Sequence, residues 1–396
     1  MTGLSLRNGA KDKALRRPKL RRENARCDRG VLVTFILLLV VGLLTLYAAS
    51  YYNAQERGDS PLSEVISQLF GIALGAACMA VIWRIDYKIL QKPVVSSSLL
   101  CLSLLLLALV AVPGVGKMLN GSRRWLKLGP VSFQPSELAK YAVILHMARM
   151  LSQPKRDLTW LFRGLVPVFV MPVVMFAMIL LQPNLSTAGS IVIVAGCMGL
   201  LAGARWVHLG LAACAGLAAG AFYAFSEPYR RARMMSYRDP FAMLSNEGYQ
   251  LAQSLMAFGS GGLFGMGVGR GRQKFAFLPY PESDFIFAVV GEDLGLIGCL
   301  GVLALFMLFI FFGLRVALRC PDRFGSLLAG GITCMIGVQC ALNVAVVVGM
   351  MPTTGLPLPF FSSGGTSISI LMGAVALLMN ISAANNAAIG RLNREP

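Results

Sequence analysis

An aspartate at position 284 stands where a glycine-rich, basic segment gives way to a long apolar run. The segment covers residues 247–283, and the run after it begins Phe285-Ile-Phe-Ala-Val-Val. An ionisable group at the edge of a membrane span is costly, so it indicates a functional site by default. A carboxylate can act as a general base in proton transfer. We therefore take Asp284 as a candidate functional residue.

Basic residues gather in two loops, residues 113–134 and 227–283, that separate apolar runs. Such clusters favour an anionic ligand. Trp125, within the first cluster, would equally suit an aromatic anchor at the membrane interface. The cations are Lys117, Arg123, Arg124 and Lys127 in the first loop and Arg230, Arg231, Arg233, Arg238, Arg270, Arg272 and Lys274 in the second.

A charged pair and a polar turn could complete a cavity near these loops. Pro135 predicts a helix start, and Glu137 and Lys140 lie three residues apart, so they share one helix face and can pair. The pair is either a simple ion pair within a helix or the charged wall of an outward-facing cavity. The turn Leu181-Gln-Pro-Asn184 either places Gln182 in the same cavity or only caps the next helix.

The glycine-rich segment has two interpretations. Gly248–Phe258 predicts an amphipathic helix in the membrane interface, with Gln250 and Ser254 among its polar positions. The glycines of residues 259–272 follow no strand, which argues against a nucleotide-binding fingerprint. They either bring backbone N–H groups close to a phosphate or let the loop pack tightly against helices.

Polar groups also stand deep among the apolar runs. Glu292 and Asp293 would lie roughly 12–14 Å beyond Asp284 along a helix, with Lys140 as a candidate partner for one of them. Residues 351–367, rich in Pro, Gly and Ser, predict an irregular, re-entrant segment, which a membrane tolerates only where it is buried or lines a cavity. The residues of this segment that we expect at the site are Ser363, Gly364 and Gly365.

The composition predicts an all-α polytopic membrane protein. Of the 396 residues, 56% are hydrophobic and 14% charged, against about 25% charged in soluble domains. About ten apolar runs approach the roughly 20 residues that a bilayer requires. We expect spans at residues 31–51, 63–83, 94–112, 134–151, 162–181, 186–203, 206–226, 284–313, 327–350 and 366–386.

The net charge of +18 predicts the orientation. Residues 1–30 hold ten basic residues, which suit a cytoplasmic tail in contact with anionic lipid better than a nucleic-acid arm. Ten spans then put residues 391–396 in the cytoplasm as well. The membrane domain would cover residues 31–390, with residues 227–283 as a large extracytoplasmic loop.

Seven motifs, in this order and with ten spans, resemble the SEDS family of FtsW, RodA and SpoVE. The Gly291-Glu292 pair resembles the division branch more than the elongation branch. The sequence departs from the family pattern at Tyr280 to Ser283, at Asn184, and at Ser363 and Thr366. The motifs are Gly121-Ser-Arg-Arg-Trp125, Phe133-Gln-Pro-Ser-Glu-Leu-Ala-Lys140, Leu181-Gln-Pro-Asn184, Gln253-Ser-Leu-Met-Ala-Phe258, Gln273-Lys274, Asp284-Phe-Ile-Phe-Ala-Val-Val-Gly-Glu-Asp-Leu-Gly295 and Leu356-Pro-Leu-Pro-Phe-Phe-Ser-Ser-Gly-Gly-Thr-Ser367.

The resemblance implies a peptidoglycan glycosyltransferase that polymerises lipid II and releases undecaprenyl pyrophosphate. Asp284 would take the acceptor's proton, and Arg124, Lys140 and Lys274, or a divalent cation such as Mg²⁺ or Mn²⁺, would neutralise the leaving diphosphate. No cofactor is otherwise implied. The expected partners are a class B penicillin-binding protein and other divisome proteins, in the bacterial inner membrane. A lipid flippase, an elongation-type polymerase, a scaffold and an ion-coupled transporter remain alternatives.

Overall fold

The structure is a computed structural model. It describes residues 27–56, 58, 60–119, 122–128, 131–154, 158, 160–225, 237–243, 248–275 and 277–392. Most of the predicted basic tail, the loop arginines Arg230, Arg231 and Arg233, and residues 393–396 of the predicted C-terminal segment lie outside these residues.

Within the described ranges, ten helices match the ten predicted spans. Because their interiors are apolar and almost free of charge, seven are long and apolar enough to cross a membrane, and α7 and the first part of α8 are shorter apolar helices. The ten are α2 (Arg29–Glu56), α3 (Ser63–Arg84), α4 (Pro93–Ala111), α5 (Pro135–Leu151), α6 (Val166–Leu180, after a short helical turn Leu161–Leu165), α7 (Leu185–Leu201), α8 (Trp206–Phe225), α11 (Ile286–Leu318), α12 (Arg323–Val347) and α13 (Gly365–Leu392). The predicted polytopic helical fold is confirmed.

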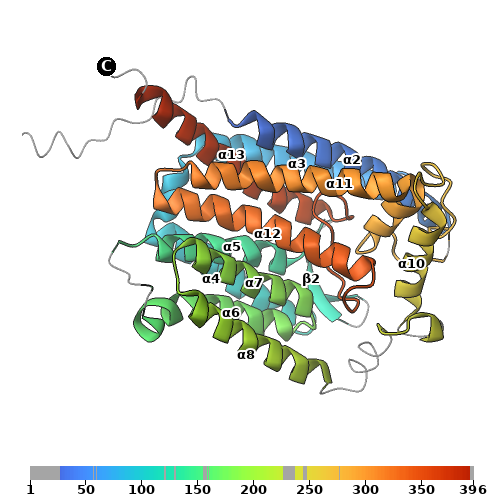
Figure 1. Ribbon diagram of the computed structural model, residues 1–396, viewed down its shortest axis with the longest axis horizontal. Helices are drawn as coiled ribbons and strands as arrows, with labels where there is room; N and C mark the ends of the chain where they lie inside the picture. Colours follow the sequence, from blue (N-terminus) through green and yellow to red (C-terminus); the bar gives the residue numbers. More distant parts are fainter. Residues whose placement is uncertain are drawn as a thin grey trace, which may run out of the picture.

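The helices run alongside one another, and different segments mark the two ends of this bundle (Figure 1). At one end the backbone N–H of Asp28, just before α2, donates to the hydroxyl of Ser382 in α13 at 2.8 Å. Figure 1 shows α10 (Tyr249–Gly261) at the opposite end from the last turns of α13. The start of α2 and the end of α13 therefore lie at the same end of the bundle, opposite α10.

The loop between α4 and α5, which holds the first cluster of basic residues, is a small sheet. It forms three antiparallel strands, in the order β1 (Gly116–Leu119), β2 (Ser122–Leu128) and β3 (Val131–Phe133). Lys117 stands opposite Trp125, and Lys127 opposite Ser132. Leu126 is buried while Lys127 is exposed, the alternation that a strand with one covered face requires.

Helix α11 is interrupted at Gly295, whose φ of 67° lies in the left-handed region. The break leaves helical carbonyls and N–H groups without partners inside the helix, and these must be satisfied elsewhere. The carbonyls of Glu292 and Asp293 accept from the N–H groups of Met266 and Gly267 at 2.9 and 3.0 Å. The loop after α10 is thus fastened to the break in α11.

Candidate active site

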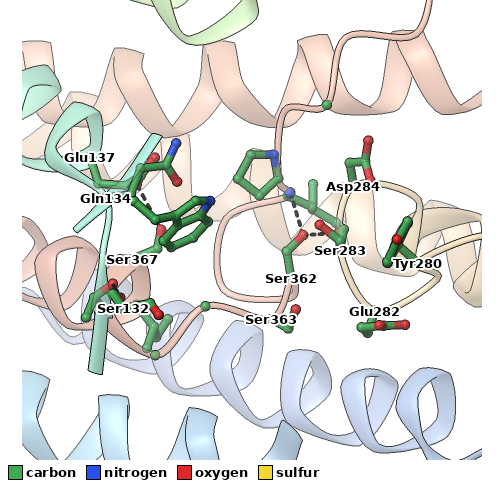
Figure 2. Close-up of a pocket in the computed structure, with 18 of the residues that line it drawn as sticks. Ser132, Gln134, Glu137, Tyr280, Glu282, Ser283, Asp284, Ser362, Ser363 and Ser367 are labelled. Atoms are coloured by element: carbon green, nitrogen blue, oxygen red, sulfur yellow. Dashed lines mark hydrogen bonds between the residues drawn. The ribbon is translucent and has the colours of Figure 1, made fainter. Parts of the chain in front are cut away.

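A cavity of about 1160 Å³ opens where α10, β2 and the segment before α13 meet. Figure 2 shows Tyr280, Glu282 and Asp284 along one side, Gln134, Glu137 and Ser367 along the other, and Ser362 between them. Asp284 is half-buried. The predicted site residues that line this cavity are Arg124, Trp125, Glu137, Gln250, Asp284, Ser363, Gly364 and Gly365.

The pair formed by Glu137 and Lys140 fits both of its interpretations. The Lys140 ammonium lies 2.8 Å from a Glu137 carboxylate oxygen and 3.1 Å from Oε1 of Gln339. Lys140 is fully buried and does not reach the cavity, whereas Glu137 lines it and accepts from the hydroxyl of Ser367 at 2.8 Å. The pair is therefore an ion pair within the helix whose acidic member faces the cavity.

Arg124 reaches the cavity from β2 and also fastens the turn between α6 and α7. Its Nε donates to the carbonyl of Gln182 at 2.9 Å, and its guanidinium also donates to the carbonyl of Pro183. The Gln182 side chain points away and donates to the carbonyl of Leu107. Asn184 caps α7 and lines the cavity, so the polar turn contributes through Asn184 and not through Gln182.

Lys274, which we predicted to neutralise the leaving group, does not line the cavity. Its ammonium lies 2.7 Å from both carboxylate oxygens of Asp293, and the side chain is 1% exposed. The expected pairing of Lys140 with Glu292 or Asp293 is wrong, because the Lys140 ammonium pairs with Glu137 and Gln339.

The glycine-rich loop wraps two buried carboxylates instead of a phosphate. The N–H groups of Gly269 and Gly271 donate to Asp293 at 3.2 Å each. Those of Arg272 and Gln273 donate to Oε1 of Glu292 at 2.5 and 2.9 Å. A β-carbon at Gly271 would overlap the Glu292 carboxylate. Of the two interpretations of these glycines, tight packing is confirmed.

The helix predicted over residues 248–258 is confirmed as α10, but one of its predicted polar positions is not exposed. Its polar residue Ser254 is fully buried and donates to the carbonyl of Val347 at 2.7 Å. Gln250 faces the cavity, and its amide donates to the carbonyl of Pro279 at 3.3 Å. Gln250 therefore belongs to the site, whereas Ser254 joins α10 to the end of α12.

Lys117 is a cavity cation that our sequence-based list of site residues missed. It stands on β1 opposite Trp125. The signal that could have found it is the pairing of β1 with the Arg-Arg-Trp strand, which puts Lys117 beside residues that were chosen.

The comparisons with known proteins agree with this arrangement. The family described as cell cycle proteins of the FtsW, RodA and SpoVE type matches residues 29–387. The chain belongs to this family. The expected membership is confirmed, and the match covers every predicted site residue.

Relatives of this family member cover nearly all of it. Stage V sporulation protein E of Bacillus subtilis is 40% identical, over 90% of this chain and 96% of the relative. A probable peptidoglycan glycosyltransferase FtsW of Geobacter metallireducens is 38% identical, over 91% and 96%. A chain of a solved peptidoglycan synthase complex is 27% identical with a TM-score of 0.73, covering 91% of this chain and 98% of that one.

Four carboxylates of the described part of the chain line the cavity, those of Glu64, Glu137, Glu282 and Asp284. Among the described residues, no three His, Cys, Asp or Glu side chains lie close enough together to hold a metal ion. The residues present therefore do not fit a metal site built by the protein alone.

Proposed function

We propose that this protein is a peptidoglycan glycosyltransferase that polymerises lipid II into glycan strands during cell division. The observation that carries the proposal is the position of Asp284 on the wall of a large polar cavity, within a segment that matches the family. The name of the FtsW relative, and its identity over almost the whole chain, support the same activity. The Gly291-Glu292 pair supports the division branch.

The reaction is a single inverting displacement. The 4-hydroxyl of the acceptor GlcNAc attacks C1 of the donor MurNAc, and the bond between C1 and the diphosphate oxygen breaks. Asp284 accepts the hydroxyl proton as general base. Undecaprenyl pyrophosphate leaves as a stable anion with the bonding electrons, so no carboxylic acid is needed to protonate it. One carboxylate therefore suffices, in contrast to the pair that a glycoside hydrolase needs.

Two cations on the cavity wall suit the leaving diphosphate. Lys140 and Lys274, which pair with Glu137 and Asp293, do not line the cavity. Among the described residues, the basic side chains of the lining are Arg124 and Lys117. Fixed positive groups aimed at developing negative charge lower the barrier of such a displacement. We assign the charge stabilisation to these two residues.

The cavity faces the outside of the cytoplasmic membrane in this proposal. The start of α2 and the end of α13 share the end of the bundle opposite α10. The ten basic residues of positions 1–30 favour the cytoplasm for that end. Both termini are then cytoplasmic in the inner membrane, and lipid-linked sugars reach the cavity from the outer leaflet.

A class B penicillin-binding protein, which would cross-link the nascent strands, is the proposed partner, together with other divisome proteins. The similarity to a chain of a peptidoglycan synthase complex supports such an assembly. We expect the partner to be needed for full activity.

The test is polymerisation by the purified protein. The protein, with and without the class B partner, is incubated with fluorescent lipid II, and the products are separated on a gel. A ladder of glycan strands is expected. A preparation that moves lipid II across vesicle membranes but forms no ladder with the partner present would favour a flippase and contradict the proposal.

A further inference from the structure

Three successive backbone carbonyls leading to the catalytic carboxylate are each held by a different donor. The carbonyl of Glu282 accepts from the backbone N–H of Ser363 at 2.8 Å. That of Ser283 accepts from the Ser362 hydroxyl at 2.5 Å, and that of Asp284 from Nδ2 of Asn343 at 2.7 Å. The stretch immediately before α11 is therefore fixed by other segments as well as by its own turn, in which the N–H of Ser283 donates to the carbonyl of Tyr280 at 3.0 Å.

Asn343 connects two irregular segments through one amide group. Its Nδ2 also donates to the carbonyl of Leu356 at 2.7 Å, and the side chain is 1% exposed. Both partners are acceptors, so the amide must present its nitrogen to them. A buried group with two such bonds ties the Asp284 loop to the segment before α13 at a defined spacing.

Ser362 makes a second connection between the Asp284 loop and the segment before α13 (Figure 2). Its hydroxyl accepts from the N–H of Leu358 at 2.8 Å while it donates to Ser283. Behind it, the Gln68 amide of α3 holds the carbonyl of Ser362 and the N–H of Gly364. We call the bonds of Asn343 and Ser362 to the Asp284 loop the clamp. The Ser362 part of this clamp is thus anchored to α3.

We propose that Asn343 and Ser362 are positioning residues that hold the Asp284 carboxylate in its reactive place on the cavity wall. The inference rests on the proposed function, because it assigns these residues a role through Asp284. Ser362 lines the cavity and Asn343 does not, but the bonds described above engage the protein's own backbone in both cases. A misplacement of about 1 Å can cost on the order of 100-fold in rate, so loosening the clamp slows the chemical step.

The test compares variants of the full chain, assayed with its partner. Ser362→Ala removes the hydroxyl, and Ser362→Thr keeps it. Asn343→Asp replaces the donating nitrogen with an oxygen that faces two carbonyls, at nearly the same volume. Ser103→Ala is the matched control, because Ser103 is a buried serine that donates to the carbonyl of Leu99 in α4 at 2.9 Å, outside the cavity lining.

We expect Ser362→Ala to lower kcat by about 10- to 100-fold, with the KM for lipid II and the thermal midpoint close to those of the Ser103→Ala variant. Ser362→Thr should recover most of the rate, and Asn343→Asp should lower kcat at least as much as Ser362→Ala. An unchanged kcat in Ser362→Ala, or a loss that follows the thermal midpoint, would overturn the inference. A wild-type protein that forms no polymer would refute the proposed function instead.

Discussion

The ammonium of Lys274 lies 2.7 Å from both carboxylate oxygens of Asp293, in a pair that is almost completely buried. This pair, with the backbone N–H groups around it, fastens the glycine-rich loop to the first part of α11, before the break at Gly295. The Lys274 charge is neutralised by Asp293 within the protein and does not face the cavity. The loop that precedes Asp284 is therefore attached to α11 through this buried ion pair.

Removal of one member of this pair should destabilise the protein and leave substrate binding intact. Lys274→Met leaves a buried carboxylate without its cation, which costs roughly 3–5 kcal/mol. The expected result is a clearly lower thermal midpoint in detergent, with an unchanged KM in the folded fraction.

The double variant Lys274→Met/Asp293→Asn is the control for this prediction. It should cost less than the sum of the single variants, because it leaves no unpaired charge. A stable Lys274→Met variant with a raised KM for lipid II would instead show that Lys274 binds substrate.

Two glycines of α10 should respond oppositely to alanine. A β-carbon at Gly261 would overlap the backbone carbonyl of Gly291 in α11, whereas one at Gly259 meets nothing within 4 Å. Gly261→Ala should force α10 away from α11 and reduce the yield of folded protein. Gly259→Ala should be neutral or stabilise the helix by up to about 1 kcal/mol. Thermal midpoints of the two purified variants decide the matter, and equal midpoints would contradict the described packing.

Lys117 should contribute to lipid II binding. Lys117→Ala should lower kcat/KM for lipid II by about tenfold, which corresponds to about 1.4 kcal/mol, through a higher KM and a lower kcat. The difference should shrink as salt screens this exposed charge. Lys127→Ala is the matched control, since Lys127 is an exposed lysine of the same sheet that does not line the cavity. Equal kcat/KM values for the two variants would remove Lys117 from the site.

Features that depend on local pattern could be predicted from the sequence. The ten helices follow from runs of apolar residues, and the pairing of Glu137 with Lys140 follows from their spacing within one helix. The irregular segment before α13 was evident from its Pro, Gly and Ser content, and it does line the cavity at Ser363.

Features that depend on how distant segments meet could not be predicted. Lys274 and Asp293 lie 19 residues apart, and only the path of the loop decides that they pair. The strand β2 is short and rich in arginine, so its sequence resembles an interfacial anchor until its pairing with β1 and β3 is known. Asn343 lies within an apolar helix, where its contact with the Asp284 backbone gives no local signal.

The most direct test of the central claim is the polymerisation rate of Asp284→Asn. The variant keeps the volume of the side chain and the backbone bonds of the loop, but the neutral amide cannot accept the hydroxyl proton. We predict a folded protein that binds lipid II with wild-type affinity and forms no glycan polymer with its partner present. Polymer formation at the wild-type rate by this variant would contradict the account.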